Sequence, residues 1–188
     1  MGSVTTVNKF AFSDDSRTTL SAGMSAAIAW SSGGAANSGV AAYFAGGYAG
    51  GYLTTIDKFA FSDDSRSTLA SGLSVGRTVL AGAANSGSFT YFAGGTTGSR
   101  VDTVDKIAFS DDSRSTLSTG LAVATESLAG AANSGTAAYF AGGYAMPVPA
   151  MVDTVYKFAF SDDSRTTLTT GLAQVLEQMA GAANSGIL

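Results

Sequence analysis

The chain has 188 residues, of which 45% are apolar and 13% charged, and it contains 24 glycines but neither cysteine nor histidine. This length and composition suit one folded domain. The absence of cysteine excludes disulfides and thiolate catalysis and leaves the redox compartment undecided, and the absence of histidine excludes imidazole catalysis. No bound cofactor or metal is predicted. The net charge of −4 argues against nucleic-acid binding, and no apolar run approaches the ~18 residues that cross a membrane.

Self-similar segments dominate the chain from one end to the other. The sequence FAFSDDSR begins at Phe10, Phe59 and Phe158, and IAFSDDSR begins at Ile107. The sequence GAANSG begins at Gly34, Gly82, Gly130 and Gly181. The resulting period of about 50 residues is typical of four-stranded repeat units, because helical repeats such as ankyrin are shorter. Enrichment in Val, Thr, Phe and Tyr between Gly, Asn and Asp also indicates strands and turns.

Each unit is expected to form four antiparallel strands, and the unit at 71–118 shows the pattern. Its first strand runs through residues 78–84 to an Asn-Ser-Gly turn, and its second carries 91–93 and stops at a double glycine. After a variable loop, the third strand covers 103–109, the turn 110–113 reverses the chain, and the fourth strand covers 114–118. The single repeat domain 1–188 then divides into units 1–20 (third and fourth strands), 21–70, 71–118, 119–168 and 169–188 (a first strand plus a stub).

These motifs resemble those of kelch-repeat β-propellers over essentially the whole chain. Tyr-x-x-Gly-Gly at 43–47, 91–95 and 139–143 resembles the kelch double glycine. The Phe-Ser-Asp-Asp-Ser-Arg-x-Thr-Leu stretches resemble the turn segment of that family, but leucine stands where the family usually has Trp, at Leu20, Leu69, Leu117 and Leu168. The resemblance implies an all-β propeller of about four kelch-like, four-stranded blades that binds proteins. The copper-oxidase activity of some relatives needs His and a Tyr–Cys pair, so it does not carry over.

One unit buries too little apolar surface to fold by itself, so neighbouring sheets are expected to cover each other's faces. The last unit reaches the turn at Asn184 and then only Leu188, so most of its second strand is missing. That loss exposes strand edges. Three arrangements remain open: a closed four-bladed ring with a defective seam, part of a larger ring formed by assembly, or a fragment of a longer array. Self-association through terminal strands is expected.

Variation among the units is confined to one end of the expected sheets. The Asn-Ser-Gly and Ser-Asp-Asp-Ser-Arg turns are identical in all four units and carry the whole net charge, whereas the loops at the opposite end differ. These loops hold residue types that anchor protein interfaces, although neutral variation of tolerant loops is the alternative. The candidate ligand-binding residues are Trp30, Tyr48, Tyr52, Arg77, Arg100, Glu126, Tyr144, Met146 and Glu177.

Three recurring motifs have structural explanations that we favour over functional ones. The paired aspartates lack the ligand spacing of a calcium loop and suit turns in which Ser and Asp side chains bond nearby N–H groups, with Arg offsetting the charge. The lysines at positions 9, 58, 106 and 157 are expected to pack along their strand, with the ammonium near a carboxylate of a neighbouring strand or in solvent. The double glycines suit sharp turns with positive φ, since no phosphate-loop lysine follows them.

The expected function is that of a non-enzymatic scaffold, because no constellation of carboxylates, Lys, Tyr or Ser predicts a catalytic site. Glu126 and Glu177 belong to different units and are weak candidates for an acid pair. A protein or glycan ligand is expected at the variable end. A lectin-like propeller is one alternative, motivated by Tyr48, Tyr52 and Tyr144 near the double glycines. A self-assembling or engineered repeat without a ligand is the other.

Overall fold

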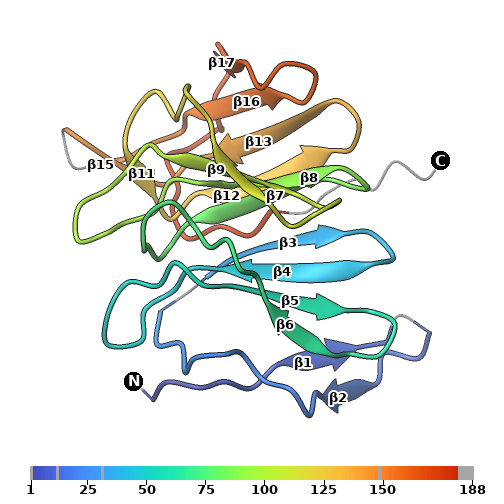
Figure 1. Cartoon of the computed structure of the whole chain (residues 1–188). Coiled ribbons are helices and arrows are strands. Elements are labelled where there is room, and N and C mark those ends of the chain that lie inside the picture. Colours follow the sequence, from blue (N-terminus) through green and yellow to red (C-terminus); the bar gives the residue numbers. More distant parts are fainter. Residues whose placement is uncertain (1, 12, 31, 148–149, 182–188) are drawn as a thin grey trace.

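The computed structural model describes residues 2–181 apart from 12, 31, 148 and 149. This part of the chain is all-β and folds into five small antiparallel sheets (Figure 1). It contains no helix long and apolar enough to cross a membrane. The expected all-β class is therefore confirmed, while the turn at Asn184 and the stub to Leu188 lie outside the described residues.

Three sheets have four strands each, joined as up-and-down meanders. The first contains β3 (Gly33–Asn37), β4 (Ala41–Ala45), β5 (Ile56–Ala60) and β6 (Arg66–Thr68). The second contains β7 (Ala81–Asn85), β8 (Phe89–Ala93), β9 (Val104–Ala108) and β10 (Arg114–Thr116). The third contains β12 (Ala129–Asn133), β13 (Ala137–Ala141), β16 (Val155–Ala159) and β17 (Arg165–Thr167).

Two smaller sheets complete the structure. A hairpin of β1 (Asn8–Phe10) and β2 (Arg17–Thr19) precedes the first four-stranded sheet. A three-stranded sheet of β11 (Thr125–Glu126), β14 (Tyr144–Ala145) and β15 (Ala150–Met151) extends the third one. The four strands expected at 78–118 are confirmed as β7 to β10, with β7 starting at Ala81 rather than at residue 78. The difference arises because Val79 has a positive φ of 52°, which interrupts the extended chain.

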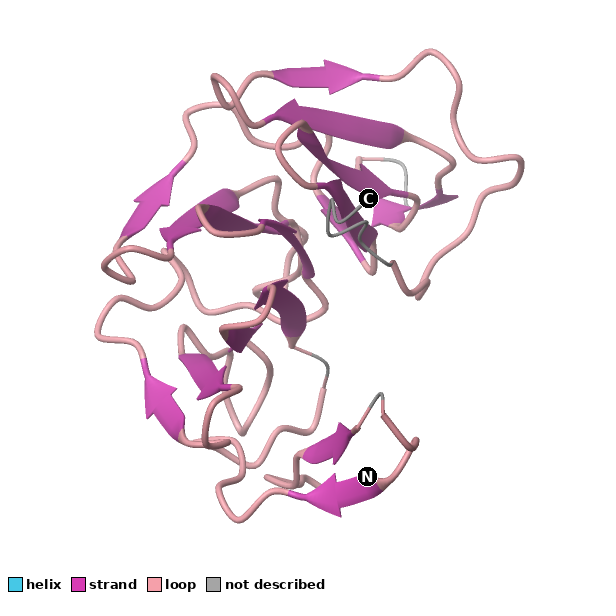
Figure 2. Ribbon diagram, turned by 90° about the vertical axis from the view of Figure 1, so that its right-hand side faces the viewer, coloured by secondary structure: helices cyan, strands magenta, loops and turns pink. Residues whose placement is uncertain are grey.

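The first strands of the three larger sheets, β3, β7 and β12, lie side by side. The sheets follow one another around an open arc that runs from the β1–β2 hairpin to the β12–β17 sheet (Figure 2). The close approach of these strands depends on glycine, because a Cβ on Gly82 would collide with the carbonyl oxygen of Gly34, and one on Gly130 with that of Gly82. The double glycines make sharp turns as predicted, with φ values of 71° and 112° at Gly46 and Gly47.

Neighbouring sheets pack on one another through buried apolar side chains. One apolar cluster joins Tyr43 and Ile56 of the β3–β6 sheet to Phe92 and Ile107 of the β7–β10 sheet. A second cluster repeats this contact between the β7–β10 and β12–β17 sheets. Fully burying a side chain of this size stabilises a fold by about 1.5–3 kcal/mol relative to leaving it exposed. Leu69, one of the four leucines that end the repeated turn segments, is buried in the first cluster.

The aspartate turns have the expected local hydrogen bonds. In each unit the first aspartate accepts a hydrogen bond from the N–H two residues later, as Asp111 does from Ser113 at 3.0 Å. Hydrogen bonding to Ser113 lowers the pKa of Asp111. The second aspartate has a positive φ in each unit, and Asp64, Asp112 and Asp163 each bind a lysine of the preceding sheet. The arginine of the turn was expected to offset the charge of the two turn aspartates. Arg66 instead pairs with Asp57 on strand β5, with 3.4 Å between its terminal nitrogen and the carboxylate oxygen.

Three of the four recurring lysines bind a carboxylate of the following sheet rather than one on a neighbouring strand of their own sheet. Lys9 pairs with Asp64 at 2.8 Å, and Lys58 pairs with Asp112 at the same distance. Lys106 repeats the contact with Asp163 at 2.9 Å. Each pair therefore links two neighbouring sheets. The recurrence of lysine on the third strand did not predict this role.

Candidate binding surface

The variable loops gather at one end of the sheets, which we call the loop end. It comprises the chain before β3, β7 and β12 and the connections β4–β5, β8–β9 and β13–β16. The opposite end, the turn end, carries the Asn-Ser-Gly and Asp-Asp turns, because consecutive strands are antiparallel. At the loop end each larger sheet is prolonged by short bridges, such as Trp30 to Tyr48 to Tyr52.

These bridges assemble an aromatic cluster from three predicted residues. The rings of Trp30 and Tyr48 stack with their centroids 4.9 Å apart, and Tyr52 meets Tyr48 edge-on at 5.2 Å. Trp30 remains 51% exposed despite this contact. The stacked neighbour therefore fixes the orientation of the indole ring and leaves about half of it accessible.

A second cluster brings together Arg100, Glu126 and Tyr144, all of them predicted. Arg100 of the β8–β9 connection forms an ion pair of 2.9 Å with Glu126 on β11. Its guanidinium carbon lies 4.2 Å from the ring centroid of Tyr144 on β14. These three side chains therefore join two neighbouring units, and part of their polarity is already used within the protein.

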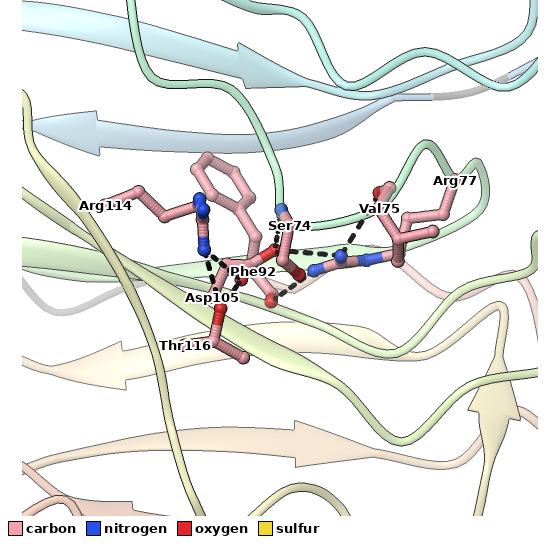
Figure 3. Close-up of polar contacts among 7 residues, drawn as sticks. All are labelled: Ser74, Val75, Arg77, Phe92, Asp105, Arg114 and Thr116. Carbon is pink, nitrogen blue, oxygen red and sulfur yellow. Dashed lines mark hydrogen bonds and ion pairs between the residues drawn. The ribbon is translucent and has the colours of Figure 1, made fainter.

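Arg77 was expected on a ligand-binding surface but lies in the interior of the protein. Its side chain is fully buried and forms an ion pair of 2.9 Å with Asp105, while its second terminal nitrogen donates to the carbonyl of Phe92 (Figure 3). Asp105 also accepts hydrogen bonds from Ser74 and Thr116. Arg77 is therefore part of the interior, where its charge is matched by a carboxylate.

The pKa values of this buried pair shift for different reasons. Burial lowers the pKa of Arg77, although the carboxylate of Asp105 opposes that effect. Burial by itself would raise the pKa of Asp105, but the hydrogen bond from Thr116 and the charge of Arg77 bring it below its ordinary value of 3.8. The charged carboxylate and the guanidinium thus stabilise each other at a distance of 2.9 Å.

The remaining predicted residues, Met146 and Glu177, lie apart from these contacts. Met146 follows β14 and is 37% exposed. Glu177 is exposed in the segment after β17, and no ion pair involves it within the described part of the chain. That part also holds no group of three carboxylates arranged to bind a metal ion.

A cavity of about 600 Å³ opens at the loop end where the first strands begin. Equivalent positions of four units line it, with Leu80 and Leu128 forming apolar walls. Trp30, Gln178 and Met179 contribute larger or more polar side chains. Sequence reasoning identified only Trp30 in this set. The signal for the others was available, because the residues just before the repeated Gly-Ala-Ala-Asn segment differ from unit to unit.

Three of the cavity residues have positive φ although none is glycine. The values are 52° at Val79, 59° at Ser127 and 57° at Gln178. This conformation directs backbone groups across the sheets, because Ser127 N–H donates to Val79 C=O at 2.9 Å and Gln178 N–H to Ser127 C=O at 3.1 Å. The rim is therefore fixed by main-chain hydrogen bonds that leave the side chains free to differ.

No family model matches the chain, and no curated protein matches it. The described residues form an all-β repeat structure with an aromatic cluster and an apolar-walled cavity at its loop end.

Proposed function

We propose that the protein is a non-enzymatic, kelch-like β-propeller scaffold that binds a protein ligand at its loop end. One observation carries the proposal: the exposed Trp30–Tyr48 stack borders a cavity at the end where the units differ in sequence. Tryptophan and tyrosine contribute much of the binding energy in protein interfaces. The successive meander sheets and the glycine contacts between their first strands support the propeller architecture.

Glycan binding is a second candidate, favoured by the same stack. An exposed indole ring offers a flat apolar face of the kind on which a sugar ring stacks, and Trp30 is held in place by Tyr48. Ser127 and Gln178 line the adjoining cavity and supply hydrogen-bonding groups for hydroxyls.

A displayed library of random peptides and a glycan array test the two candidates with the same variants. Peptides selected on the wild-type protein should bind Trp30→Ala and Tyr48→Ala about tenfold or more weakly, since anchors of this kind dominate interface energy. The matched control is Phe61→Ala, which removes an exposed aromatic ring at the turn end. Equal losses in all three variants would contradict a loop-end site. Binding to glycans with the same variant pattern, and no selectable peptides, would favour the lectin-like alternative.

A further inference from the structure

The two junctions between the four-stranded sheets use the same contacts. A lysine of one sheet binds the second turn aspartate of the next, as in Lys58–Asp112 and Lys106–Asp163. The tyrosine beside it donates to the same carboxylate, since Tyr43 bonds Asp112 at 3.2 Å and Tyr91 bonds Asp163. We call the face that points to the following sheet the trailing face; in the β7–β10 sheet it carries Tyr91 and Lys106. The opposite face, which carries the second turn aspartate and a large apolar residue such as Ile107, is the leading face.

The trailing face of the β12–β17 sheet lacks these contacts. Tyr139 and Val155 are only half-buried, whereas their counterparts in the two preceding sheets are fully buried. Leu172 is half-buried as well, although the equivalent Leu73 and Leu121 lie in the two apolar clusters. Lys157 occupies the position of Lys106 but forms no ion pair with any described residue.

The leading face of the β1–β2 hairpin is uncovered as well, with its apolar residue exposed and its aspartate unpaired among the described residues. Phe10 is 61% exposed, while the residues at the same position in later sheets are buried: Phe59 at 3%, Ile107 at 0% and Phe158 at 0%. Asp15 has the positive φ of the other second turn aspartates, 55°, yet it has no ion-pair partner in the described chain.

We propose that these two faces bind each other between two copies of the chain, head to tail. Lys157 and Tyr139 of one copy contact Asp15 of the second, and Phe10 of the second covers Val155 of the first. The contact continues the packing that already joins the sheets within one copy, and its charges are complementary. It involves neither the cavity nor the aromatic cluster of the loop end, so it stands independently of the proposed ligand site.

A second copy is the occupant because the two faces of one molecule do not meet. The β1–β2 hairpin and the β12–β17 sheet lie at opposite ends of the open arc (Figure 2). A head-to-tail contact joins different surfaces on the two partners, so repetition produces a closed ring or an open chain of copies.

Sedimentation velocity over a range of concentrations tests the contact. The wild-type protein should associate reversibly, and Phe10→Lys and Lys157→Glu should each weaken association ~10-fold, because each places a repelling or desolvated charge in the contact. Both residues are accessible, so the variants should retain the wild-type melting temperature when dilute. Asp102→Lys, an exposed charge reversal outside both faces, is the matched control and should associate like the wild type.

Mixing the two weakened variants gives the decisive result. Phe10→Lys retains an intact trailing face, and Lys157→Glu retains an intact leading face, so a mixture contains one unaltered contact. The mixture should form a heterodimer with wild-type affinity that does not grow further. A wild-type protein that stays monomeric at all concentrations, or a mixture that does not associate, would overturn the proposal.

Discussion

At the turn end of the molecule the repeated polar groups hold the sheets together, whereas at the loop end equivalent positions carry different side chains around a cavity. The turn-end hollow is lined mainly by the same Ala, Ser and Gly residues from successive units. The loop-end cavity is lined by Trp30, Val79, Gln178 and Met179, among others. The contacts between sheets are therefore repeated from unit to unit, whereas the side chains around the loop-end cavity differ between units.

Arg77 and Asp105 are the exception, because they lie near the loop end but are buried and structural. We expect Asp105→Asn to lower the free energy of unfolding by about 3–5 kcal/mol, since it leaves a buried guanidinium without a counter-charge. Urea denaturation measures this loss. The exposed Asp102→Asn is the control, and an equal effect of both substitutions would contradict the assignment of Asp105 as a structural residue.

The same pair makes a pH-dependent contribution. The pKa of Asp105 is lower in the folded than in the unfolded chain, so its contribution is complete above pH 3.8 and is lost as the pH falls through the folded value. Wild-type stability should therefore fall more steeply below pH 4 than that of Asp105→Asn. Parallel acid profiles for the two proteins would show that Asp105 is not the responsible carboxylate.

A smaller effect is expected from the asparagines that connect neighbouring turns. Asn85 accepts a hydrogen bond of 2.8 Å from the N–H of Gly135 in the next sheet. Asn85→Ala should cost about 0.5–1.5 kcal/mol, the usual contribution of one such bond. Asn133→Ala is the matched control, because no such bond from its side chain is found within the described residues. Thermal unfolding of both variants distinguishes a contact between sheets from a local turn effect.

The lysines allow the same comparison for charge. Lys106 binds Asp163 and lies over the ring of Phe89, whereas Lys157 has no described ion-pair partner. Lys106→Met should destabilise the protein by about 0.2–1 kcal/mol in low salt and less in high salt, as expected of a partly exposed pair. Lys157→Met, measured in dilute solution, should have no effect. Equal stabilities of the Lys106→Met and Lys157→Met variants would show that the Lys106–Asp163 pair does not stabilise the protein.

A stability change of similarly small size is expected for Trp30→Ala at the loop end. Half of this side chain is exposed and its main contact is the ring of Tyr48, so the loss should stay near ~0.5 kcal/mol, as is usual for surface substitutions. A large fall in melting temperature would mean that the stack supports the fold and would move Trp30 to the structural set with Arg77.

The sequence predicted the strands and turns well because their causes are local. Alternation of apolar residues, the double glycines and the aspartate turns depend on a few neighbouring residues, and they took the expected form apart from the turn arginine, which pairs with a strand aspartate. The loop-end residues were also recognisable, since units within one chain can be compared. Arg77 was misplaced because nothing near it in sequence indicates that Asp105 lies beside it.

The all-β class, the period of the units and the end at which they vary can be read from the order of the residues. The partner of each lysine, the burial of Arg77 and the uncovered sheet faces became visible only in the folded molecule. Those outcomes depend on how one sheet is set against the next. Side chains some 50 residues apart meet there, and the energy of their contact is not encoded in any short segment.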